Sequence, residues 1–177
     1  SLTGVEAGDA GGIARILMMY GIAFSAGGIP LISLGDEVGQ LNDSSYLNDP
    51  ATAKDSRWVG RPYRPHDLYA QRNDPSTTAG QIFAGMKRMI DARCNAPGLA
   101  GNAIEGFDTD NPHVLGYVRN GGGQEICVLA NFSDDAQAID ADQFVGTAPR
   151  LTDLITGESY HVRTGVTLQS HQIVWLS

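Results

Sequence analysis

The sequence predicts a chain in two parts, an α/β part as far as about residue 97 and an all-β part after it. The first sign is an apolar run at Ile29–Leu34, which follows a helical pattern and suits a strand buried on both faces of a parallel sheet. The second sign is a change of sequence pattern at Gly98, after which short apolar or alternating runs recur between turns. The 177 residues suffice for one large or two small domains.

The first element is a helix from about Ala10 to Ala26, for which Asp9 is a plausible N-cap. Its apolar residues recur at helical spacing on one face: Ile13, Leu17, Tyr20 and Phe24. Arg15 is its only charged residue, so we expect the helix to be nearly buried. Gly27 and Gly28 end it.

The apolar run Ile29–Leu34 predicts a short strand, which Gly35 ends with a sharp turn. Asp36 and Glu37 follow directly and would stand at the strand's carboxyl end. Ligands bind at this end of the strands in barrels and in open α/β sheets. The two carboxylates are adjacent, so on an extended strand they point to opposite faces and cannot converge on one bond.

Residues 40–79 hold no long apolar pattern, and we expect a long loop there. Ordered loops of this length are uncommon and are usually functional. A helix from about Ser76 to Asn95 follows, with apolar residues at Ile82, Met86, Met89 and Ile90. Pro97 and Gly98 stop it.

Residues 98–177 are expected to form an antiparallel sandwich or a small barrel, because short strands and turns alternate there. Gly121–Gly123 predicts a hairpin connection, and Thr156-Gly157 predicts another turn. The expected strands are 113–119, 125–132, 136–139, 150–155, 159–162 and 172–176.

The net charge of −8 is unevenly distributed. Residues 1–97 hold nine Lys and Arg against ten acidic residues, whereas residues 98–177 hold three Arg against ten acidic residues. The acidic second half argues against nucleic acid or an anionic membrane as a partner. Cys94 and Cys127 lack metal-type spacing and are interpreted as reduced thiols. We expect neither a metal site nor a cofactor.

No apolar run reaches the roughly 20 residues of a membrane span. The N-terminus does not show a basic region before an apolar one, so no secretory signal is visible. A cytoplasmic location is therefore favoured. Ser1 is not a natural start, and a targeting segment upstream of it would escape detection.

Four stretches of the sequence resemble the α-amylase family of (β/α)8-barrel glycoside hydrolases and transglucosylases. GIPLISLGDEVG at Gly28–Gly39 resembles the family's eighth barrel strand, with Ser33 in place of a common Tyr. DSRW at Asp55–Trp58 and YAQRNDPSTTAGQI at Tyr69–Ile82 resemble the amylosucrases within it. The ending TLQSHQIVWLS is also similar, with Ser170-His171 in place of Pro-Tyr.

The resemblance implies the C-terminal remnant of a (β/α)8 barrel over residues 1–97 (helix, strand, long loop, helix) and a C-terminal antiparallel β-sandwich domain over residues 98–177. Amylosucrases transfer glucose from sucrose to an α-1,4-glucan with release of fructose, by a retaining double displacement. That chemistry needs two carboxyl groups across the scissile bond. The resemblance places the nucleophile, the acid/base and the transition-state stabiliser upstream of Ser1, so no catalytic residue is expected here and the chain alone should be inactive.

The candidate substrate-binding residues are Arg72, Asp36 and Arg57. The resemblance implies that Arg72 lies at the bottom of the glucose pocket, paired with a carboxylate from an early barrel loop. An arginine fork can bind a carboxylate through two hydrogen bonds and so fix a pocket wall. Asp36 or its neighbour Glu37 could bind sugar hydroxyls or hold the long loop. Arg57 and Trp58 could form part of the wall or anchor the loop.

Two other functions stay open. The full-length protein could be a sucrose hydrolase, an α-glucosidase or an α-amylase of the same family, or residues 98–177 could act as a carbohydrate-binding module. Exposed coplanar aromatic side chains on one sheet face would favour the module. We also expect the chain alone to self-associate through residues 10–95, because an isolated barrel remnant exposes its apolar face.

Overall fold

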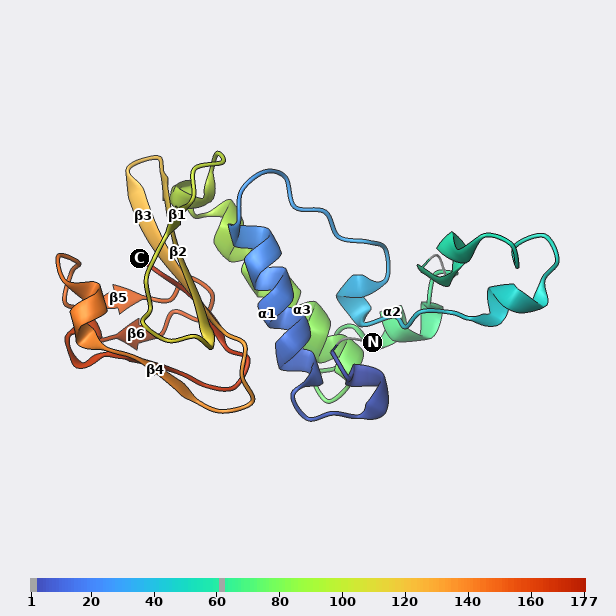
Figure 1. The fold of residues 1–177 in the computed structure, drawn as a ribbon. Coiled ribbons are helices and arrows are strands. Elements are labelled where there is room, and N and C mark those ends of the chain that lie inside the picture. The colour runs from blue at the N-terminus through green and yellow to red at the C-terminus, as the bar shows by residue number, and fades with distance from the viewer. Residues whose placement is uncertain (1–2, 61–62) are drawn as a thin grey trace. The chain divides into compact units, whose positions relative to one another are not determined.

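The computed structural model describes residues 3–60 and 63–177 (Figure 1). These residues form two compact units. The first unit comprises the described residues of 1–13 and 31–84, and the second comprises residues 14–30 and 85–177. The units therefore divide the chain within two helices. The assignment of residues 1–97 to a barrel and 98–177 to a separate domain stays a prediction.

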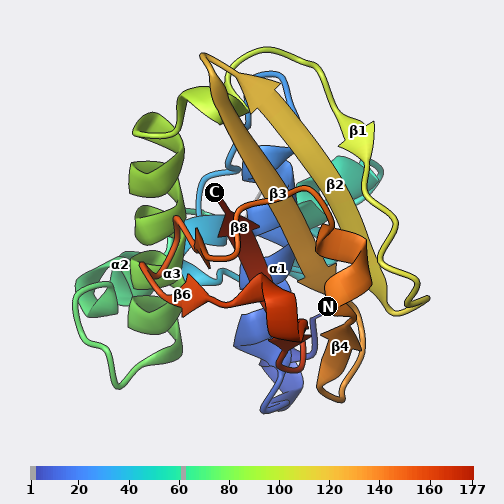
Figure 2. The same cartoon turned by 90° about the vertical axis from the view of Figure 1, so that its left-hand side faces the viewer.

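The second unit is built around a four-stranded antiparallel sheet in the order β1-β2-β3-β8 (Figure 2). Two further antiparallel pairs, β4 with β7 and β5 with β6, complete the strands. This arrangement confirms the predicted antiparallel β part. The strands are β1 (Glu105–Gly106), β2 (Val114–Gly121), β3 (Gln124–Asn131), β4 (Gln137–Ile139), β5 (Leu151–Thr152), β6 (Ser159–Tyr160), β7 (Val166–Leu168) and β8 (Ile173–Leu176).

The turn between β2 and β3 is the predicted glycine hairpin. Gly121 pairs with Gln124, which leaves Gly122 and Gly123 as the two loop residues. Their φ angles are 54° and 79°. A two-residue hairpin with positive φ at both positions matches the right-handed twist of the strands and needs residues that tolerate that region. The glycines therefore fix the register of the longest strand pair.

Strands β3 and β8 are buried on both faces, although antiparallel strands commonly leave one face in water. One face belongs to the β core, a cluster that contains Cys127, Leu129, Val174 and Leu176 among its buried residues. Alternate residues point to the opposite face. That face carries the buried side chains of Ile126, Val128, Ala130, Ile173 and Trp175.

Two helices supply apolar surface to the second unit. They are α1 (Gly12–Ser25) and α3 (Thr78–Cys94), which confirm the two predicted long helices. A Cβ atom at Gly21 of α1 would lie 2.9 Å from two side-chain atoms of Ile173 in β8. A Cβ atom at Gly85 of α3 would lie 2.6 Å from Leu17 of α1. These glycines allow the helices to approach the sheet and each other closely.

The predicted strand at Ile29–Leu34 does not form. The side chains of Ile29, Leu31 and Leu34 are 90%, 85% and 68% exposed, and the segment has no regular structure. A parallel strand needs neighbouring strands to pair its backbone groups. The described part of the chain supplies no such neighbour, so the strand prediction is wrong for this structure.

The long loop of the first unit contains more structure than we expected. Short 3-10 helices occur at Ser45–Asn48 and Ser56–Gly60, and α2 spans His66–Gln71. Pro65 precedes α2 at its N-cap position. Six residues are too few to display the helical period that reveals a helix in a sequence. The loop prediction was therefore correct about the missing long helix and wrong about α2.

Candidate functional site

The Gly35–Gly39 segment forms a tight turn in the first unit. Asp36–Val38 make a single 3-10 turn between Gly35 and Gly39, whose φ angles are 103° and 69°. The Gly35 carbonyl accepts hydrogen bonds from the backbone N–H groups of Val38 at 3.1 Å and Gln40 at 3.0 Å. Positive φ angles are cheap only for glycine, so the sequence G-D-E-V-G folds locally into this turn. We refer to Gly35–Gly39 as the GDE turn.

Glu37 uses its carboxylate to hold the loop. One oxygen accepts a hydrogen bond from the Gly35 N–H at 2.8 Å, and the other accepts one from the Tyr69 hydroxyl. Tyr69 belongs to α2, 32 residues further along the chain. The hydrogen bond therefore joins the GDE turn to the segment that ends in Arg72.

Tyr69 is half-buried, and its ring lies against a second charged residue. The Arg64 guanidinium carbon lies 4.5 Å from the ring centroid, which is the geometry of a cation–π contact. Burial raises the pKa of the Tyr69 hydroxyl, and the neighbouring Glu37 carboxylate raises it further. The hydroxyl is therefore protonated at neutral pH and acts as the donor to Glu37.

Arg72 lies directly after α2 and is exposed. Its Nη1 donates a hydrogen bond to the Tyr69 carbonyl oxygen at 2.6 Å. Among the described residues, no carboxylate forms the pair with Arg72 that the resemblance implies. Asp36 is half-buried in the GDE turn. The structure thus ties the segments of Arg72 and Asp36 together through Tyr69 and Glu37.

Arg57 is engaged elsewhere, with a carboxylate in its own segment. Its Nη2 donates to Asp55 Oδ2 at 2.7 Å and its Nε donates to Asp55 Oδ1 at 2.8 Å. The Asp55 hydrogen bond raises the pKa of the Arg57 guanidinium. This bidentate pair anchors the Ser56–Gly60 turn. Arg57 is therefore positioned by a local pair, not by Arg72 or the GDE turn.

A small cavity of about 160 Å³ lies in the long loop. Its lining combines aromatic rings with carboxylates, and the Trp58 side chain is 38% exposed beside it. Asp43 and Asp49 accept backbone hydrogen bonds from Ser45 and Ala51, so both carboxylates shape the loop. The cavity is lined by Asp43, Ser45, Tyr46, Asp49, Thr52, Trp58 and Tyr63.

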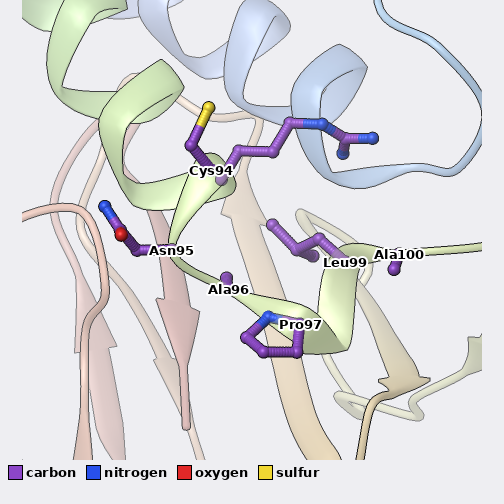
Figure 3. A pocket seen from close by; sticks show the side chains of 7 residues that line it. Cys94, Asn95, Ala96, Pro97, Leu99 and Ala100 are labelled. Atoms are coloured by element: carbon purple, nitrogen blue, oxygen red, sulfur yellow. The ribbon is translucent and has the colours of Figure 1, made fainter.

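The second unit has a cavity of about 280 Å³ where α3 ends (Figure 3). Its walls come from the turn that follows the helix, between Arg93 and Ala100. In Figure 3 the side chains of Cys94, Asn95 and Leu99 point in different directions and do not converge on one point. Convergent polar groups mark a binding site, and this cavity lacks them.

Within residues 98–177, all of which are described, the largest aromatic side chains are mostly in the core. Tyr117, Phe144 and Trp175 are 4%, 0% and 0% exposed, whereas Phe132 is 52% exposed. A carbohydrate-binding face needs several exposed rings in one plane. The surface of the β strands does not present them.

Among residues 3–60 and 63–177, no group of three or more His, Cys, Asp and Glu side chains has a geometry that could hold a metal ion. In the same ranges, every helix is too short or too polar to cross a bilayer.

Residues 104–175, which are less than half of the chain, match the family model of the maltogenic amylase C-terminal domain. Solved structures with the same fold match a larger share of this chain than the family model does. The structure of AmyP in complex with maltose matches with a TM-score of 0.75 and 14% identity, over 96% of this chain and 35% of that chain. The trehalulose synthase MutB from Pseudomonas mesoacidophila MX-45 matches with a TM-score of 0.61 and 17% identity, over 93% of this chain and 38% of that chain.

At these identities the structural matches show the fold alone, which is that of the matched parts of AmyP and MutB, and residues 104–175 match an amylase C-terminal domain. This confirms the predicted fold class, apart from the strand at Ile29–Leu34. The chain spans little more than a third of the length of the structures that it matches, at 35% and 38%.

Proposed function

We propose that this chain is the C-terminal part of an amylosucrase-like enzyme. The complete enzyme transfers a glucosyl unit from sucrose to an α-1,4-glucan, releases fructose and retains the anomeric configuration. Its substrates, sucrose and α-glucan, are its partners, and neither nucleic acid nor a membrane is one.

One observation carries this proposal. The GDE turn, which resembles the α-amylase family, and the Tyr69–Ile82 segment, which resembles the amylosucrases, belong to one compact unit, and the Glu37–Tyr69 hydrogen bond joins them. Arg72 follows Tyr69 by three residues and is exposed. Its guanidinium can therefore meet a carboxylate or a sugar, as the resemblance implies.

The reaction requires a carboxylate nucleophile and a carboxylic acid/base on opposite sides of the scissile bond. Both oxygens of Glu37 already accept hydrogen bonds, from Gly35 and Tyr69, which suits a structural role. Asp36 is adjacent to Glu37 and is assigned to substrate binding. As the resemblance implies, we assign the nucleophile, the acid/base and the transition-state stabiliser to residues upstream of Ser1 in a longer protein.

In this proposal Arg72 closes the far end of the glucose pocket and pairs with an upstream carboxylate. Asp36 contacts the glucosyl unit or the loop beside it. Arg57, held by Asp55, forms part of the pocket rim together with Trp58. No metal ion or organic cofactor takes part.

Hydrolysis is the second candidate. The match of residues 104–175 to the maltogenic amylase C-terminal domain and the likeness to AmyP bound to maltose favour an α-glucan hydrolase. Transfer and hydrolysis differ in whether a sugar hydroxyl or water attacks the glucosyl-enzyme intermediate. The products therefore distinguish the two functions.

The test is to incubate the complete gene product with sucrose and glycogen and to quantify the products. Amylosucrase activity predicts fructose release together with elongation of glycogen, and Arg72→Ala should reduce both. Equal amounts of glucose and fructose without elongation would identify a hydrolase. Trehalulose as the product would identify an activity like the one named for MutB. Maltose release from glycogen without turnover of sucrose would favour the α-glucan hydrolase.

The 177-residue chain alone is the control, and it should release no fructose. Fructose release by the chain alone, abolished by Arg72→Ala, would mean that a catalytic pair lies among its own residues.

A further inference from the structure

We propose that Tyr69 is a positioning residue of the proposed sucrose site, which holds Arg72 in a fixed place relative to the GDE turn. This inference rests on the proposed function. Three groups of Tyr69 make three different contacts: the hydroxyl with Glu37, the ring with Arg64 and the carbonyl with Arg72. Each contact has a separate consequence.

The hydroxyl fixes the position of α2. It donates to a Glu37 carboxylate that the Gly35 N–H also holds, at 2.8 Å. A hydrogen bond to a charged group stabilises a structure more strongly than one between two neutral groups. Because the two residues are 32 positions apart, this bond restrains a long loop at one point.

The ring and the carbonyl fix what lies around α2. Arg64 lies over the ring at 4.5 Å, so the ring plane is held from one side by a cation. The Tyr69 carbonyl accepts from Arg72 Nη1 at 2.6 Å, which directs the guanidinium from the end of the helix. The guanidinium has five N–H donors, and this contact uses one of them. The remaining donors are available for recognition of a carboxylate or sugar hydroxyls.

A displacement of Tyr69 would therefore move Arg72, although Tyr69 itself is not assigned a contact with the substrate. Precise placement of binding groups contributes strongly to enzymatic rates, so even a small displacement of Arg72 should lower the rate. The Glu37 carboxylate has the same role at the other end of the hydroxyl contact. Neither side chain is assigned a contact with the reacting atoms.

The first test is a double-mutant cycle in the complete enzyme, with fructose release from sucrose as the readout. Tyr69→Phe removes only the hydroxyl and should lower kcat/KM about tenfold, mainly through a higher KM. In an Arg72→Ala background the same substitution should have no further effect, because Tyr69 acts through Arg72. Additive effects of the two substitutions would overturn the proposal.

Tyr160→Phe is the matched control. Tyr160 lies in β6 of the second unit, where its hydroxyl contacts Gln172 and Glu158, so loss of this hydroxyl should leave kcat/KM unchanged. An equal loss in Tyr160→Phe and Tyr69→Phe would also overturn the specific role of Tyr69.

A second test needs no enzymatic activity. Hydrogen exchange in the 177-residue chain should become faster in both 35–40 and 69–74 in Tyr69→Phe, and in neither segment in Tyr160→Phe. Unchanged exchange in 35–40 would show that the hydroxyl does not hold the GDE turn and would overturn the proposal. Absence of fructose release by the complete enzyme would instead overturn the proposed function, and with it the role of Tyr69 in a sucrose site. The exchange result would still decide whether Tyr69 links the two segments.

Discussion

Arg119 is fully buried in β2, and its hydrogen-bond partners are backbone carbonyls. Its Nη1 reaches the carbonyls of Ser25 and Ala26 at the C-terminal end of α1. These are carbonyls that a helix leaves without an intrahelical partner, and the negative end of the helix dipole lies there. The other acceptors are the carbonyls of Leu99, Ala100, Gly101 and Ala103. Arg119 therefore joins the end of α1 to the connection that follows α3.

We predict that Arg119→Met destabilises the chain by about 3 kcal/mol, because it removes the donors from buried carbonyls. Arg119→Lys keeps the charge but has only three donors and cannot span the same acceptors, so its loss should be intermediate. Urea unfolding followed by circular dichroism measures both. Equal stability of Arg119→Met and the wild type would show that water replaces the guanidinium.

The Cys127 thiol makes the free energy of unfolding depend on pH in the alkaline range. Burial and, as the smaller cause, the Glu125 carboxylate raise the pKa of this thiol from its ordinary value of 9.0 to about 12. The folded state therefore keeps the proton over a range in which the unfolded state has lost it. The stabilisation is complete below pH 9.0 and is lost as the pH rises towards about 12.

We therefore expect the free energy of unfolding to fall between pH 9 and pH 12, and to fall less steeply in Cys127→Ala. Tyr117 and Tyr160 also have raised pKa values, mainly through burial, and their contribution should remain in the variant. Denaturant titrations at a series of pH values provide the slopes. Parallel slopes in the two proteins would contradict the assignment to Cys127.

At the scale of elements, the helices approach their neighbours through glycine. Gly21 of α1 faces Ile173, a β-branched residue of β8 that is 8% exposed. Gly85 of α3 faces the terminal methyl groups of Leu17. A branched side chain is stiff near the backbone, whereas the end of a leucine can change rotamer. The two contacts should therefore tolerate an added methyl group differently.

We predict that Gly21→Ala destabilises the chain by about 1–3 kcal/mol, since overpacking exceeds the gain in helix propensity. Gly85→Ala should cost less, because the propensity gain of about 1 kcal/mol offsets most of a contact that Leu17 can relieve. Thermal unfolding of both variants checks the order. A Gly85→Ala variant less stable than Gly21→Ala would show that Leu17 cannot move.

The elements also show which parts of the fold can be predicted from local sequence. The periodic patterns of α1 and α3 and the glycine hairpin between β2 and β3 were predicted correctly, because each is specified by residues close together in the chain. Short β1 and β7 were missed because two or three residues carry no pattern. The strand at Ile29–Leu34 was predicted from its apolar run, yet pairing requires neighbouring strands that the described residues do not provide.

At the scale of the whole molecule, Leu31 and Leu34 are apolar side chains that are 85% and 68% exposed. Exposed apolar groups close together favour association. Our prediction that the isolated chain self-associates through residues 10–95 therefore stands as a proposal.

We expect the sedimentation coefficient of the chain to rise with concentration, and less so in the double variant Leu31→Asp/Leu34→Asp. Val145→Asp is the matched control, since Val145 is 76% exposed and lies outside residues 10–95. A concentration-independent monomer in the wild type would contradict self-association. Equal suppression by the control would assign it to net charge.

The sequence by itself determined the two long helices, the antiparallel strands after residue 98 and the segments that contain Asp36 and Arg72. These features depend on periodicity, turn residues and short motifs, which are local properties of the chain. Only the tertiary structure decided that Glu37 binds Tyr69 and that Arg57 pairs with Asp55. It also decided that Arg119 is buried among backbone carbonyls and that most of the apolar side chains of Ile29–Leu34 are exposed. Hydrogen bonds between distant residues, burial and strand pairing depend on which segments the fold brings together, and a local pattern does not contain that information.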